Sequence, residues 1–174
     1  MKDNNDAVSF PEAPTIKDSN QATPDVIEPA PTTEEAISEP SEYEVMRTNA
    51  IAKQNHAIQT KLEKVISYTK QTMVAYMSEE DLNRLCAYVA EYSSGDTLQK
   101  ISPVKVDSQL KSVDIMHFGW NIGKAFSKKR IHTATFIKNV FDHTLRDLEI
   151  STIERKMSHT ESVCKIKLDM NIAK

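Results

Sequence analysis

Cationic and hydroxyl side chains in the C-terminal half are the groups in this sequence best suited to bind a ligand. Three cations follow one another in Ser127-Lys128-Lys129-Arg130, and a second group stands in the segment Ile150-Ser-Thr-Ile-Glu-Arg-Lys156. Lysine and arginine neutralise phosphates, while hydroxyls and the free amides at a helix start donate hydrogen bonds to them. The predicted nucleic-acid contacts are Lys124, Lys128, Lys129, Arg130, Ser151, Thr152, Arg155 and Lys156.

The distribution of charge supports this interpretation. The formal net charge is −3, but residues 1–44 alone hold 11 acidic and two basic residues, so residues 45–174 carry a net +6. All of that excess lies from residue 100 onward, where 14 basic residues face 8 acidic ones. A basic half of this kind attracts polyanions such as nucleic acid.

The segment Gly119-Trp-Asn-Ile-Gly123-Lys124 superficially resembles a nucleotide-binding P-loop. Such a loop needs four residues between its glycines and a Ser or Thr after the lysine, whereas here three residues intervene and Ala125 follows. Glycines four apart lie on one face of a helix and allow a neighbouring element to approach closely. We therefore expect close helix packing here, with Trp120 as an anchor of the core.

Catalysis and metal binding have little support in the sequence. The five histidines and two cysteines stand at no recognisable catalytic or ligand spacing, and the cysteines fit a reducing compartment. We predict no catalytic residue, no metal site and no cofactor, hence a protein that is not an enzyme. The histidines and cysteines are His56, His117, His132, His143, His159, Cys86 and Cys164.

The N-terminal segment, residues 1–41, has the composition of a disordered tail. Six of the seven prolines lie in the first 40 residues, and large apolar side chains are few. The tail either solubilises the protein or competes, as a flexible polyanion, with nucleic acid for the basic half. We find no signal-peptide core and no apolar run of membrane-spanning length, so we expect a cytoplasmic protein without a membrane partner.

Residues 42–95 are predicted to form two helices. Ser41 and Glu44 have the spacing of a capping box, and apolar residues recur at helical intervals from there to about Met77. Ile51, Ile58 and Val65 are seven residues apart, as in a coiled coil, so the helix at 44–77 either packs on the body or forms a homodimer. A second helix opens at Ser78 and ends at residues 93–95.

Residues 96–174 form the predicted basic domain. Residues 101–106 are an edge strand or a short extended connection, a third helix is capped by Asp107 or Ser108 and reaches Phe126, and a fourth begins near Ile131. Apolar and polar residues alternate over 164–172, which predicts a β-strand. A single strand needs a partner, either residues 101–106 or the same strand of a second copy.

The segment from Thr133 to Met157 is similar to a helix-turn-helix. Ser151 and Glu154 have capping-box spacing, so a short helix with Arg155 and Lys156 on its outer face follows the fourth helix. In that motif the second helix enters the major groove of DNA. A strand at 164–172 would then act as a wing, but only one strand is evident. The alternative is one helix over 131–157, because no Gly or Pro follows Gly123.

The sequence thus predicts a mainly α protein, a bundle of four to five helices with a C-terminal strand that could be winged-helix-like, preceded by a disordered acidic tail. The predicted function is a DNA-binding accessory or regulatory protein. The alternative is a non-catalytic interaction or scaffolding protein that self-associates or docks on a partner through the helix at 44–77.

Overall fold

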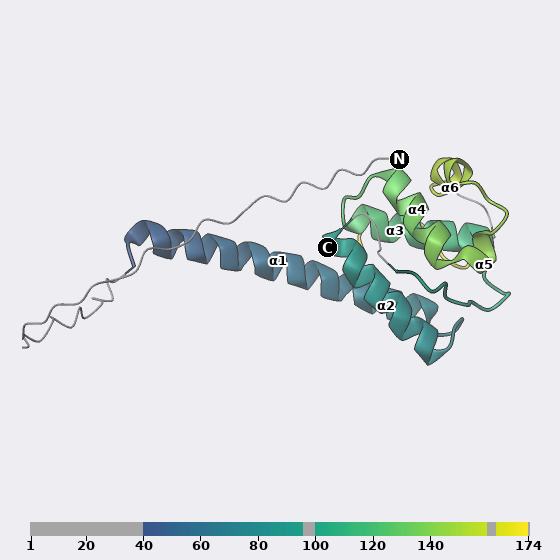
Figure 1. Cartoon of the computed structure of the whole chain (residues 1–174), viewed down its shortest axis with the longest axis horizontal. Helices are drawn as coiled ribbons and strands as arrows, with labels where there is room; N and C mark the ends of the chain where they lie inside the picture. Colours follow the sequence, from purple (N-terminus) through teal and green to yellow (C-terminus); the bar gives the residue numbers. More distant parts are fainter. Residues whose placement is uncertain (1–39, 96–99, 160–162, 174) are drawn as a thin grey trace, which may run out of the picture. The chain divides into compact units, whose positions relative to one another are not determined.

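The computed structural model describes residues 40–95, 100–159 and 163–173, and over these ranges the protein is mainly helical, as predicted (Figure 1). The disordered tail predicted for residues 1–41 lies almost wholly outside the described residues. Residues 40–174 belong to one compact unit. Its helices are α1 (Glu42–Met73), α2 (Glu79–Ser94), α3 (Ser112–Ala125), α4 (Arg130–Val140), α5 (Asp142–Leu145) and α6 (Ile150–Lys156).

Side-chain caps fix where the first two helices begin. The amide of Ser41 donates to Glu44 Oε2 at 2.8 Å and the amide of Glu44 donates to Ser41 Oγ at 3.3 Å, so the predicted capping box is confirmed. Ser78 Oγ accepts from the amide of Asp81 at 3.2 Å, and α2 ends at Gly95 as expected. Figure 1 shows α2 beside the C-terminal half of α1, where the two helices are in contact.

Helix α3 is the centre of the core. It buries every residue from Val113 to Gly123 except Trp120, and it contacts α1, α4 and α6. A side chain at Gly119 would overlap Ile137 of α4, and one at Gly123 would overlap Thr133. The predicted close approach at the two glycines is confirmed, and its partner is α4.

The segment before α3 differs from the prediction at one point. Residues 101–106 form the short extended connection, which was one of the two predicted alternatives; the amide of Val104 holds it by donating to the carbonyl of Val140 at 2.9 Å. Asp107 does not cap α3, because its carboxylate accepts from the amide of Gln109 at 2.7 Å and closes a turn instead. The helix therefore begins at Ser112, later than expected.

The segment over 131–157 is broken, so a single helix there is wrong. Helix α4 ends at Val140, the one-turn α5 follows, and α6 begins only at Ile150. Lys138 Nζ donates to the carbonyls of Leu145 and Arg146 at 2.9 and 2.8 Å and so closes the end of α5 from the side of α4. Phe141, Leu145 and Ile153 are buried along this path.

The predicted C-terminal strand is wrong, and with it the winged-helix interpretation, since the described residues contain no strand. The alternation itself has a cause: Ile166 is buried, while Lys165 and Lys167 on either side of it are exposed. An extended segment shows this two-residue alternation of buried and exposed side chains whatever groups hydrogen-bond its backbone. Here side chains of α3 take the place of a neighbouring strand.

Three polar residues on one face of α3 hold the C-terminal segment. Asp114 Oδ1 accepts from the amides of Lys165 and Ile166 at 2.6 and 3.1 Å. Asn121 donates to the carbonyl of Lys167 at 2.9 Å and accepts from the amide of Asp169 at 2.8 Å. These bonds satisfy backbone groups that a sheet would otherwise pair.

His117 lies between these two residues and is 1% exposed. Its Nδ1 and Nε2 each lie 2.7 Å from a carbonyl oxygen, of Ile166 and His159 respectively. Carbonyl oxygens only accept, so both bonds form at once only when the ring carries both protons. The ring lies between the two carbonyls and holds residues 159 and 166 against α3.

Asp114→Asn should release the C-terminal segment. Asparagine has one acceptor oxygen where the carboxylate serves three amides, and its NH₂ group would face a donor, so we expect a loss of about 1–3 kcal/mol in unfolding free energy. Hydrogen exchange should speed up at the amides of Lys165 and Ile166. Asp107→Asn is the control, because one oxygen suffices there; equal exchange in both variants would contradict this role.

Candidate functional site

The structure brings the two predicted basic groups together. Helix α4 begins beside the end of α6, since the guanidinium of Arg130 hydrogen-bonds the carbonyls of Glu154 and Arg155. Lys129 and Arg130 from one group therefore lie next to Arg155 from the other, although 25 residues separate Arg130 from Arg155 in the chain.

Two of the predicted phosphate contacts are instead bound to backbone carbonyls. Lys128 Nζ donates to the carbonyl of Gly95 at 2.9 Å and so closes the end of α2. Arg130 donates to Ser158 Oγ at 3.1 Å in addition to the two carbonyls of α6. A cation at a helix C-terminus satisfies unpaired carbonyls and complements the helix dipole. These residues therefore join helices to one another.

Ser151 and Thr152 do not occupy the predicted cap. Glu149 is the N-cap residue of α6 and Ile150 the first helical residue, so the predicted capping box of Ser151 with Glu154 is wrong. Glu149 makes no side-chain hydrogen bond to the first amides of α6, but it places an acidic residue at the start of the helix, where a phosphate would have to bind. Arg155 and Lys156 lie in the last turn of α6, away from the helix start that reads DNA in a helix-turn-helix.

Trp120 is half-buried at the edge of the core and has cations over its ring. Lys124 Nζ lies 4.8 Å and the guanidinium carbon of Arg130 lies 5.0 Å from the ring centroid. These residues, with Lys128 and Thr133, line a hollow of about 70 Å³. The tryptophan thus helps to hold Arg130 in position, in addition to the core contact that was predicted.

The cations left at the surface are Lys124, Lys129, Arg155 and Lys156, all of them exposed. Lys129 directly precedes α4, and Arg155 and Lys156 lie in the last turn of α6, which Arg130 contacts; we refer to this contact as the α4–α6 edge.

A different surface runs along α1. Every residue from 42 to 59 is exposed, and Val65, Thr69 and Met73 near the other end are its buried residues. The exposed part carries large apolar side chains: Tyr43 is 72% exposed, Met46 65%, Ile51 48% and Ile58 59%. An apolar stripe of this kind on a helix is ordinarily covered by another element.

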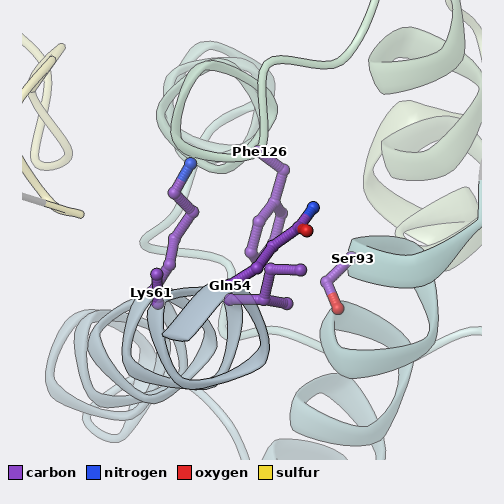
Figure 2. A pocket seen from close by; sticks show the side chains of 6 residues that line it. Gln54, Lys61, Ser93 and Phe126 are labelled. Atoms are coloured by element: carbon purple, nitrogen blue, oxygen red, sulfur yellow. The ribbon is translucent and has the colours of Figure 1, made fainter. Parts of the chain in front are cut away.

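The exposed face of α1 leads into a cavity of about 310 Å³. It lies where α1 meets the ends of α2 and α3, and its lining comprises Gln54, Ala57, Ile58, Lys61, Ser93 and Phe126. Figure 2 shows these side chains around the hollow, with Phe126 reaching toward α1. The sequence contained a signal for the Ile58 side of this cavity, the seven-residue spacing, but none for Ser93 or Phe126.

Other classes of site find no supporting group in the described residues. Over residues 40–95, 100–159 and 163–173 no cluster of three or more His, Cys, Asp or Glu side chains is placed to hold a metal ion. None of the helices in those ranges has the length and apolar composition required to cross a bilayer. No family model, curated protein or solved structure matches the chain significantly.

Arg130→Ala should lower the unfolding free energy by about 1–3 kcal/mol, because it leaves the last carbonyls of α6 without their charged donor. Lys129→Ala, one residue away and exposed, should change it by less than about 0.5 kcal/mol. Urea unfolding followed by circular dichroism measures both. Equal losses in the two variants would show that Arg130 is an ordinary surface cation.

Proposed function

We propose that the protein is a non-catalytic helical scaffold that self-associates through α1. The observation that supports this most is the exposure of residues 42–59, a run of 18 helical residues that carries five exposed large apolar side chains on a helix whose other end is built into the core.

The length of this run argues for a partner. Helices shorter than about 12–15 residues are marginal in water even with favourable sequences, and most helical stability in proteins comes from packing an apolar face. The exposed part of α1 contains the β-branched residues Val45, Thr48, Ile51 and Ile58, which lower helix propensity. Packing on a second helix would supply the missing stabilisation.

The position of the apolar residues indicates which face is used. Ile58 and Ile51 lie seven and fourteen residues before the buried Val65, so they continue the face that is buried further along. The same face can therefore pack on the body at one end and on a second α1 at the other.

Replacing Ile51 and Ile58 by Glu should convert the dimer to monomer. Both side chains are exposed within one copy, so the fold should keep its stability, and each substitution counts twice in a symmetric dimer. We expect the dissociation constant to rise at least about 100-fold in sedimentation equilibrium. Val163→Glu is the matched control, since Val163 is 80% exposed and lies outside α1. If the wild-type chain is still monomeric at a protein concentration of about 100 µM, self-association is refuted.

Binding of nucleic acid is the second candidate, favoured by the contact of Arg130 with the last turn of α6, which brings the start of α4 beside the exposed Arg155 and Lys156. Because Lys128 and Arg130 are bound to backbone carbonyls and Glu149 caps α6, the remaining cations suit contacts to phosphates rather than to bases. Such binding would be independent of sequence and sensitive to salt.

Replacing Lys129, Arg155 and Lys156 together by Ala should flatten the salt dependence of binding to duplex DNA. Each lost phosphate contact lowers the slope of log K against log salt by about 0.9, so we expect a change of about 2–3. The control replaces Lys53, Lys64 and Lys70 of α1, which removes the same charge and leaves the cavity unchanged. Equal slopes in both triple variants, or no DNA binding at low salt, would exclude this edge as the contact.

A further inference from the structure

We infer that the second copy lies antiparallel on α1, with its first turn in the cavity beside Ile58 and Phe126. The inference rests on the proposed self-association and specifies its geometry. Each copy would fill the other's cavity, so the interface is two-fold symmetric.

The body decides the direction of the second helix. From Val65 onward the apolar face of α1 is buried by the rest of the chain. If two copies of α1 packed in parallel through this face, the parts of the two chains that follow residue 65 would have to occupy the same space. Antiparallel helices place the bodies at opposite ends and leave residues 42–59 of each copy to pair.

The same constraint limits how far the helices overlap. A second helix can advance along the exposed face only until its first turn meets the ends of α2 and α3, which is where the cavity lies. Ser41 caps α1, so Tyr43 and Met46 are the first large apolar residues to arrive there. With Tyr43 opposite Lys61 of the other copy, Met46 stands opposite Ile58.

The side chains and charges suit this register. The cavity of about 310 Å³ has room for an aromatic ring, and Phe126, Ala57 and Ile58 give it an apolar wall. Tyr43, Gln54 and Lys61 follow one another at helical spacing on the face that opens into the cavity. Arg47 and Lys61 lie on this face, seven residues to either side of Gln54, so a parallel pair would set like charges against each other, whereas here Lys61 faces the ring of Tyr43.

Disulfide trapping tests the direction and register. In the double variant Met46→Cys/Ala57→Cys the two positions are 11 residues apart, about 16 Å along one helix, so they cannot bridge within one chain. We expect mild oxidation to give a covalent dimer in high yield. Asn49→Cys/His56→Cys, on the opposite face, is the matched control, and the wild-type chain with Cys86 and Cys164 gives the background.

The outcomes separate this inference from the function on which it rests. A cross-linked dimer of Met46→Cys alone would mean parallel helices and overturn the inference while self-association stands. A dimer by sedimentation in which the double variant does not cross-link would overturn the register alone. A monomeric wild type would overturn both.

Loss of the aromatic ring gives a second measurement. Tyr43→Ala should weaken the dimer at least tenfold, because the ring leaves two cavities empty at once, and it removes no contact within one copy. Val45→Ala should change the dissociation constant of the dimer less than twofold. It also truncates an exposed apolar residue of the first turn, but on the other side of α1. Equal effects would overturn the assignment of Tyr43 to the cavity.

Discussion

The burial of α3 on nearly all sides is the constraint on which the rest of the structure depends. A helix inside a core can hold polar side chains only if each has a partner, because an unpaired buried polar group costs about 1–3 kcal/mol. Asp114, His117 and Asn121 meet this condition by binding backbone groups of residue 159 and of residues 165–169. The C-terminal segment is therefore ordered by the polar face of a helix and needs no second strand. The two glycines of α3 complete the arrangement by letting α4 approach its other side.

The same accounting of backbone groups explains much of the basic charge in the C-terminal half. Lys128, Arg130 and Lys138 bind the carbonyls that end α2, α6 and α5. Short helices have few internal bonds relative to their unpaired ends, so a cation that reaches across from another helix stabilises both the end and the contact. A surplus of cations in sequence is consequently an imprecise measure of nucleic-acid binding. Exposed cations such as Lys129, Arg155 and Lys156 are the part of the surplus that can contact a ligand.

Helix α1 differs from the other helices because residues 42–59, about half of its length, are exposed and take no part in the core. One end is held by Val65, Thr69 and Met73, and the other end has apolar residues exposed beside a cavity. A rigid helix anchored at one end presents its free face in a fixed direction, and this restricts both the direction and the overlap of whatever packs on it. The way a partner can pack on such a surface depends on where the buried part of α1 begins as much as on the apolar residues of its exposed part.

The sequence by itself determined the features that depend on neighbours in the chain. Capping residues Ser41 and Ser78, the end at Gly95 and the apolar spacing of Ala134, Ile137 and Val140 predicted helix positions and buried residues correctly, since these signals act within a few residues. Tertiary structure decided where the partners are far away: Arg130 binds α6, Asp114 replaces a strand, and Phe126 meets Ile58 across a cavity. The alternation over 164–172 is typical of an extended segment, but its pairing depends on side chains some 50 residues earlier. No local pattern reports what a backbone group will bind at that distance.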